Sequence, residues 1–209
     1  MKKKHKGLSR EKSRGLLVII SGPSGVGKST IVAKLFKICP ELKLSTSATT
    51  RPKRPFEKDK EDYYFLSEEE FFKLEKKGEF IEWAKVHAYY YGTPRSFIEK
   101  ELEKGNTVVL EVDVQGAASI KELSSKNKVK AASEVFVFLI PPSVDILAFR
   151  LKKRKTEKIE EQNYRLRSAI AELQVMEKYD YIVVNDTVES AAEKIKAIIN
   201  VEKERMLLN

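Results

Sequence analysis

Short apolar runs alternate with longer amphipathic segments along most of the chain. The runs at 17–21, 107–114, 135–140 and 181–184 predict strands, because a strand that is buried on both faces is apolar at nearly every position. Helical spacing follows these runs, at 28–38, 94–104, 115–123, 143–153, 159–178 and 188–206. Buried strands that alternate with helices predict an α/β fold, with a parallel sheet and helices on both faces.

Residues 44–95 break this alternation. The candidate strands there are short and half polar, at 44–50, 62–66, 80–84 and 89–93. The single helix among them begins at a capping box formed by Ser67 and Glu70. We therefore expect a small mixed α+β lobe over 44–95, inserted into a core made of residues 15–43 and 96–209.

The first predicted strand leads directly into a glycine-rich loop. Residues 22–30 read Gly-Pro-Ser-Gly-Val-Gly-Lys-Ser-Thr, which is the P-loop pattern between a strand and a helix. Glycines let several backbone N–H groups point at an anion, and the following helix adds its positive end. Lys28 would reach the β- and γ-phosphates of ATP, and Ser29 would offer its hydroxyl to Mg²⁺. A glycine-rich turn without a ligand is the alternative. The predicted ATP-binding residues of this loop are Gly22, Pro23, Ser24, Gly25, Val26, Gly27, Lys28, Ser29 and Thr30.

Composition narrows the class of partner without choosing one. The chain has 209 residues and a formal net charge of +9, which favours anionic ligands. Much of the excess lies in residues 1–14, which we interpret as a solvated basic tail, with a nucleic-acid arm as the less favoured alternative. Cys39 stands alone, so no internal disulfide framework is expected, and no run has the length of a membrane span. These features favour a reducing, cytoplasmic setting without membrane contact, and they leave the oligomeric state open.

Two arginines lie three residues apart in the loop that opens the predicted lobe. Residues 47–54 read Ser-Ala-Thr-Thr-Arg-Pro-Lys-Arg. Arg51 and Arg54 suit a monophosphate, because guanidinium groups bind phosphate in a bidentate manner. Tyr63 and Tyr91 would add phenolic donors. An ordinary solvated basic loop would have the same composition.

Taken together, the motifs resemble those of guanylate kinases, from Leu16 to about Ile199. The resemblance depends on the order and spacing of many short pieces, each weak alone outside the P-loop. The pieces are the P-loop, Ser47-Ala48-Thr49-Thr50-Arg51-x-x-Arg54, Glu57, Asp62-Tyr63-Tyr64-Phe65, Glu79-Phe80-Ile81-Glu82-Trp83-Ala84, Tyr90-Tyr91-Gly92-Thr93-Pro94, Asp113-Val114-Gln115-Gly116, Pro141-Pro142-Ser143, Arg150-Leu151-x-x-Arg154 and Asn185-Asp186.

The resemblance implies a phosphotransferase that uses ATP to convert GMP to GDP, with dGMP as a candidate second acceptor. It implies that Arg51, Arg54, Tyr63 and Tyr91 hold the GMP phosphate. It also implies that the guanine contacts Ser47, Glu82, Thr93 and Asp113. The chemistry agrees, because guanine presents N1–H and N2–H₂ donors beside its O6 acceptor, and a carboxylate accepts two donors at once. An adenine ring would meet the same groups with the opposite polarity.

Further roles follow from the same resemblance. Arg150 and Arg154, in a charged lid over about 143–167, and Arg165 would neutralise the transferred phosphoryl group. Asn185 would contact the adenine of ATP. Glu111 and Asp113, two apart on one predicted strand, are expected to point to one face, and Glu111 would orient water on Mg²⁺.

The chain departs from the family pattern at several positions. Glu111 stands where the family usually has Asp, and Phe56 and Lys60 stand where it has glycines. Ala88-Tyr89 replaces a Gly-Asn pair, and His87 is expected to be structural. Three other functions remain open: a non-catalytic module of guanylate kinase type, a P-loop kinase for another monophosphate or sugar phosphate, and a nucleic-acid binder.

Overall fold

The protein was analysed as a computed structural model, which describes residues 15–86, 88–125, 133–152 and 159–208. Its larger sheet has five strands in the order β2-β7-β1-β8-β9, and every pair in it is parallel. The predicted parallel α/β sheet is therefore confirmed. The strands are β1 (Leu16–Ser21), β2 (Lys43–Leu44), β7 (Val108–Glu111), β8 (Ser133–Ile140) and β9 (Tyr181–Val184).

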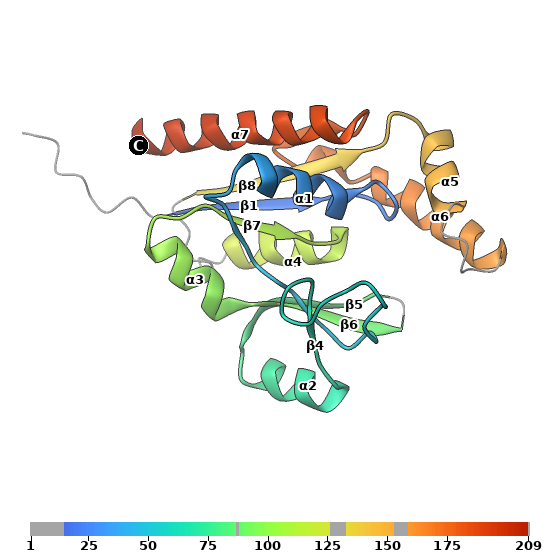
Figure 1. Cartoon of the computed structure of the whole chain (residues 1–209), viewed down its shortest axis with the longest axis horizontal. Helices are drawn as coiled ribbons and strands as arrows, with labels where there is room; N and C mark the ends of the chain where they lie inside the picture. Colours follow the sequence, from blue (N-terminus) through green and yellow to red (C-terminus); the bar gives the residue numbers. More distant parts are fainter. Residues whose placement is uncertain (1–14, 87, 126–132, 153–158, 209) are drawn as a thin grey trace, which may run out of the picture.

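Helices cover both faces of this sheet, as the apolar runs predicted (Figure 1). Alternate residues of β1 divide between two cores. Leu16, Val18 and Ile20 join the cluster with residues of α1 and α7, whereas Leu17 and Ile19 join the cluster with residues of α3 and α4. The covering helices are α1 (Lys28–Ile38), α3 (Arg95–Glu103), α4 (Val114–Ser125) and α7 (Val188–Leu208).

The structure corrects three of the predicted elements. The run at 181–184 is not a buried strand, because β9 lies at the sheet edge and only Val183 is fully buried. The strand predicted over 107–114 is shorter, because β7 ends at Glu111 and Val114 already belongs to α4. The helix predicted over 159–178 ends at Leu173, and a 3-10 turn, η1 (Met176–Lys178), follows it.

A second, smaller sheet lies beside the first, with strand order β4-β3-β6-β5. Helix α2 packs on it through Phe71, whose ring stacks 4.7 Å from that of Phe80. The predicted capping box at the start of α2 is confirmed, with Ser67 and Glu70 hydrogen-bonded reciprocally. We call this unit the small lobe; it consists of β3 (Ala48–Thr49), β4 (Tyr64–Phe65), α2 (Glu68–Lys76), β5 (Phe80–Val86) and β6 (Tyr89–Pro94).

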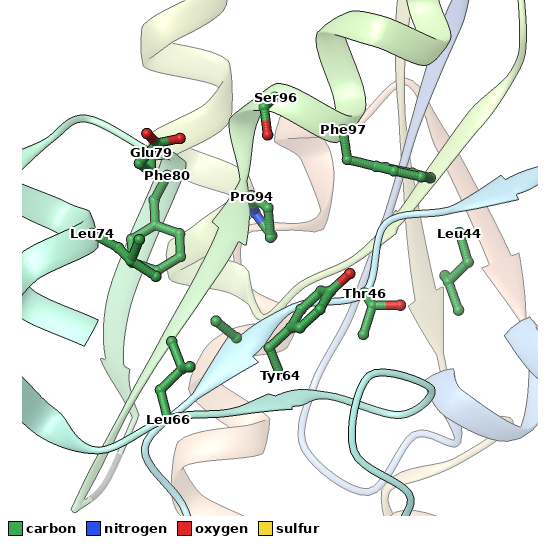
Figure 2. Close-up of a pocket in the computed structure, with 11 residues that line it drawn as sticks. Leu44, Thr46, Tyr64, Leu66, Leu74, Glu79, Phe80, Pro94, Ser96 and Phe97 are labelled. Carbon is green, nitrogen blue, oxygen red and sulfur yellow. The ribbon is translucent and has the colours of Figure 1, made fainter. Parts of the chain in front are cut away.

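The chain crosses between the two sheets twice, after β2 and before α3. A cavity of about 310 Å³ lies at these crossings. Figure 2 shows around it Leu44 at the end of β2, Thr46 between the sheets, Pro94 at the end of β6, Phe97 of α3 and Phe80 of β5. None of the predicted site residues lines this cavity.

Two further helices, α5 (Val144–Lys152) and α6 (Ile159–Leu173), stand at one end of the larger sheet (Figure 1). Ser143 caps α5 as predicted, because its Oγ accepts a hydrogen bond from Ile146 N at 3.2 Å. Leu147 and Leu151 of α5 pack against Ala169 of α6. Within the described parts of the chain, no helix combines the length and the apolar character that crossing a membrane requires.

Candidate active site

The glycine-rich loop 22–30 connects β1 to α1 and adopts backbone angles that glycine favours. Gly25 has φ +82° and Gly27 has φ +102°, in the left-handed region that other residues rarely occupy. A Cβ on Gly25 would lie 2.7 Å from Leu151 Cδ2, and one on Gly27 would lie 2.7 Å from Asn185 Nδ2. The glycines therefore serve both the turn and the close packing of the loop on its neighbours.

Lys28 folds back over the start of this loop. Its Nζ donates to Gly22 O at 2.6 Å and contacts Pro23 O at 3.4 Å. The ammonium group thus lies beside the backbone at the start of the loop, and its predicted contact with nucleotide phosphates stays a prediction.

Ser29, in the first turn of α1, contacts Glu111 at the end of β7. The hydroxyl of Ser29 donates to Glu111 Oε1 at 2.6 Å. Burial raises the pKa of Glu111, while this hydrogen bond and the charge of Lys28 oppose the shift. Hydroxyl and carboxylate oxygens are the ligand types that Mg²⁺ prefers, so these two residues fit a magnesium site that nucleotide phosphates would complete. Within the described chain no group of three or more His, Cys, Asp or Glu side chains could hold a metal without such help.

Glu57 organises the predicted monophosphate clamp. Its Oε1 accepts from Arg51 Nη2 at 2.7 Å, and its Oε2 accepts from the backbone N–H of Arg54 at 2.8 Å. Burial alone would raise the pKa of Glu57, but these hydrogen bonds outweigh it and the pKa is lowered. The Arg54 side chain itself is exposed, with Nη1 3.8 Å from Glu57. One guanidinium is therefore held in place and the other extends into solvent.

Two tyrosines complete this clamp. The rings of Tyr63 and Tyr91 pack edge to face with centroids 6.0 Å apart, and the Arg51 guanidinium lies 5.5 Å from the centre of the Tyr63 ring. Tyr91 is also a hydrogen-bonding partner of Arg51. Burial, with a smaller contribution from the charge of Glu111, raises the pKa of Tyr63 to about 12. Tyr63 therefore stays protonated at neutral pH and keeps its donor.

Two acidic side chains from different parts of the fold converge on Gly116. A Cβ on this glycine would lie 3.0 Å from Glu82 Oε2 and 3.3 Å from Asp113 Oδ1. Glu82 belongs to β5 and accepts a 2.5 Å hydrogen bond from Thr93 Oγ1 of β6. Ser47 lies beside this strand pair, just before β3, and is half-buried.

Asp113 reaches this point in a way that the sequence did not predict. The expectation that Glu111 and Asp113 share one face of a strand is wrong, because β7 ends at Glu111. Asp113 instead caps α4, with Oδ1 accepting from Gly116 N at 2.7 Å. A short acidic side chain immediately before a helix commonly caps it, so Glu111 turns to Ser29 and Asp113 turns to Glu82.

Glu82 is almost fully enclosed, with 8% of its surface exposed. Burial raises its pKa to about 7, the negative charge of Asp113 adds to the shift, and the hydrogen bond from Thr93 opposes it. A perturbed carboxyl group in a polar recess is typical of a functional site. Thr93 donates to Glu82 Oε1, and Glu82 Oε2 lies on the side of Gly116.

The helices at the sheet end place Arg150 on the P-loop. Its guanidinium donates to Val26 O at 3.1 Å and to Asn185 O at 3.3 Å. The Asn185 side chain is also turned inward, since its Nδ2 donates to the same Val26 carbonyl at 2.6 Å. Arg165 lies half-buried on α6. Arg154, the remaining predicted arginine, lies outside the described residues.

The sequence analysis missed two contacts of this region. Glu57 belongs to the quoted motif, yet only the fold shows that it holds Arg51. The backbone N–H of Ser24 donates to Glu172 Oε2 at 3.1 Å, between residues 148 positions apart. A hydrogen bond to a backbone group leaves no residue preference at one of its two ends, so no pattern could have indicated it.

Comparison with known proteins decides the family. A sequence model described as guanylate kinase matches residues 14–202. The chain belongs to the guanylate kinase family. A guanylate kinase of Caldanaerobacter subterraneus subsp. tengcongensis is 51% identical over 195 residues, which cover 93% of this chain and 91% of the relative. One from Thermotoga maritima is 44% identical over 94% of this chain and 91% of its own length.

A solved structure agrees with these relatives. The crystal structure of a guanylate kinase from Anaplasma phagocytophilum superposes with a TM-score of 0.74 at 35% identity, covering 91% of this chain and 87% of the other. Two of the departures noted above, Lys60 and Phe56, can be located in the fold, whereas His87 lies outside the described residues. Lys60 has φ +66° and is the one non-glycine residue with positive φ among those described, whereas Phe56 has ordinary backbone angles and a side chain that is 97% exposed.

Proposed function

We propose that this protein is an ATP:GMP phosphotransferase, which transfers the γ-phosphoryl group of ATP to GMP and forms ADP and GDP. The observation that carries the proposal is the meeting of Glu82 and Asp113 at Gly116 in a chain that also has a P-loop. Two acceptors in one recess suit a purine whose edge donates twice. The activity belongs to purine nucleotide metabolism, and its proposed compartment is the cytoplasm, where ATP is abundant.

In this proposal the guanine enters beside Glu82. Its N1–H and N2–H₂ groups would donate to the carboxylates, and the Ser47 hydroxyl would donate to O6. Thr93 donates its one hydroxyl proton to Glu82, so its proposed part in reading the guanine is to orient that acceptor. An adenine ring offers an acceptor at N1 and would leave buried polar atoms unpaired, which costs about 1–3 kcal/mol for each.

The phosphate of GMP is assigned to Arg51, Arg54, Tyr63 and Tyr91. Glu57 keeps one guanidinium aligned, and the Tyr63 phenol keeps its proton. Arg54 extends into solvent and would close on the ligand. This arrangement would hold a phosphate oxygen as the nucleophile, so no side chain needs to act as a strong base.

Charge neutralisation supplies the rest of the catalysis. Lys28 would bridge the ATP phosphates, and Arg150, Arg154 and Arg165 would balance the charge that spreads over the equatorial oxygens in the transition state. Mg²⁺, held through Ser29 and water on Glu111, would neutralise the charge shared by the β- and γ-phosphates. Asn185 Oδ1 is buried and has no hydrogen-bond partner in the described part of the chain, which leaves it as the acceptor for the adenine amino group.

We further propose that residues 44–95 act as the GMP-binding lobe and about 143–167 as the lid, on a core of 15–43 and 96–209. GMP would swing the lobe inward about its two crossings, and ATP would close the lid. Closure excludes water from the transferred group, which prevents simple hydrolysis.

The test is an ADP-release assay with GMP, dGMP, AMP, UMP and dTMP as acceptors. We expect GMP to exceed AMP in kcat/KM by at least about a hundredfold. Glu82→Gln should lower kcat/KM for GMP by about tenfold to a hundredfold, because the amide turns a donor toward guanine, whereas the KM for ATP stays unchanged. Glu79→Gln, an exposed neighbour of the same lobe, serves as the matched control. Equal turnover of AMP would overturn the guanine assignment. Turnover of another acceptor without GMP would indicate a different kinase, and no turnover with any acceptor would favour a non-catalytic module.

A further inference from the structure

We propose that Glu172 is a positioning residue of the phosphoryl-transfer site, which sets the P-loop and Lys28 against the lid helix α6. The inference rests on the proposed role of Lys28. The decisive contact is the hydrogen bond from Ser24 N to Glu172 Oε2, at 3.1 Å. At this distance the Glu172 oxygen is within hydrogen-bond reach of a backbone donor in the P-loop.

The Pro23–Ser24 peptide unit is held from both of its sides. Its N–H points to Glu172, and its carbonyl oxygen lies 3.4 Å from Lys28 Nζ and accepts from Val26 N at 3.2 Å. Every peptide bond in the described chain is trans, so this N–H and carbonyl point in opposite directions from one rigid plane. Rotation of the plane that broke the bond to Glu172 would also move the carbonyl away from Lys28.

The partner of this peptide belongs to the helix that carries Arg165. Glu172 follows Arg165 by seven residues, about two helical turns, so both lie on one face of α6. Helix α6 is fixed in turn, because its Ala169 packs against Leu147 and Leu151 of α5. The same Leu151 packs closely against Gly25 of the P-loop. The outer side of the P-loop is therefore set on both helices, by an apolar contact at Gly25 and a polar contact at Ser24.

A negative charge beside a polyphosphate site works against binding of the ligand, because like charges repel. An acidic residue here is therefore a poor choice for filling space alone. It is a good choice for orienting a backbone donor, since a carboxylate accepts and never donates. The inference is that the acceptor oxygen at this distance matters, and that the charge is secondary.

Two variants separate these properties in the full-length enzyme. Glu172→Gln keeps an acceptor oxygen at the same reach and loses the charge, whereas Glu172→Asp keeps the charge and loses one methylene of reach. We expect E172D to lower kcat about tenfold and to raise the KM for ATP severalfold, with the KM for GMP within about twofold of wild type. We expect E172Q to remain within about threefold of wild type in all three constants.

Glu177→Asp, an exposed substitution on the following 3-10 turn, is the matched control. Thermal unfolding of every variant accompanies the kinetics, because a merely structural loss would reduce the active fraction and leave both KM values unchanged. The inference is overturned if E172D behaves like wild type, if E172Q is impaired as much as E172D, or if only kcat falls together with the melting temperature. Absence of GMP-dependent turnover in the wild-type enzyme would instead refute the proposed function.

Discussion

At Glu82, burial and binding make opposite demands on one side chain. Guanine needs an ionised acceptor, whereas enclosure by β6 and the charge of Asp113 favour the protonated acid and raise the pKa to about 7. The ion is therefore formed at a cost in folding free energy that ligand binding offsets. This conflict places a titration within the physiological range at the residue that we propose reads the base.

We expect GMP use to depend on pH through this group. Below pH 7 protonated Glu82 has lost an acceptor, so kcat/KM for GMP should fall as the pH drops from about 8 to about 6, approaching tenfold per unit below the pKa. The KM for ATP should change little. Steady-state kinetics over this range test the prediction, and a flat GMP profile would contradict it.

The same shift has a consequence for stability with a definite sign. Between the ordinary value of 4.5 and about 7, the folded protein binds more protons at Glu82 than the unfolded chain does. The contribution of Glu82 to stability therefore falls as the pH rises through this window. Glu82→Gln, which does not titrate, should remove that part of the pH dependence and supplies the control.

Lys60 offers a second prediction for a single residue. Its φ of +66° lies in the region that costs an L-residue about 1–2 kcal/mol. Lys60→Gly should raise the free energy of unfolding by roughly 0.5 kcal/mol, because relief of the strain exceeds the added entropy of the unfolded chain. Urea denaturation would measure the change. Lys53→Gly, in the same exposed loop without positive φ, should destabilise, and a loss of stability in both variants would refute the explanation.

Among the elements, helix α2 connects local sequence to the position of the site. Its capping box is encoded by Ser67 and Glu70, and its buried face presents Phe71 to Phe80 and Trp83 of β5. Strand β5 carries Glu82. A signal of four residues therefore starts a helix whose packing supports the strand that would read guanine.

Loss of this cap should be felt in folding. Ser67→Ala removes the acceptor for Glu70 N, which is worth about 1 kcal/mol in a typical N-cap. We expect the free energy of unfolding to fall by about that amount, which urea denaturation would show as a lower midpoint. Ser67→Thr keeps a hydroxyl and should stay close to wild type. Equal midpoints for all three proteins would show that the first turn of α2 forms without its cap.

For the whole molecule, the arrangement predicts a closing motion. The two sheets are joined by two chain crossings with a cavity of about 310 Å³ between them (Figure 2). The residues that we assign to GMP come from the small lobe and from Asp113 of the core, so on this proposal a bound ligand would contact both units. Binding energy can then shift the population toward a closed form.

Small-angle scattering would detect that closure. We expect the radius of gyration to fall when GMP and a non-hydrolysable ATP analogue are both added, and to stay unchanged with AMP in place of GMP. Unchanged scattering with both ligands bound at saturation would contradict a swinging lobe.

The linear order of residues was sufficient for the features that depend on local spacing. Apolar runs predicted the parallel sheet, the glycines and Lys28 predicted the P-loop, and Ser67 and Ser143 predicted the starts of two helices. These succeed because a strand, a tight turn and a helix cap each depend on residues within a few positions of one another. The prediction that β9 is buried was wrong for the same reason, because an apolar run predicts a strand but does not show how many of its faces other elements will cover.

The tertiary structure alone decided which distant groups meet. Glu82 approaches Asp113 because β5 of the small lobe lies beside the start of α4, and Asp113 faces that way because it caps the helix instead of continuing the strand. Glu172 reaches Ser24 only through the packing of α6 on α5. Contacts of this kind depend on how whole elements orient, and that orientation is set by the sum of many weak packing contacts, none of which is visible in the spacing of a motif.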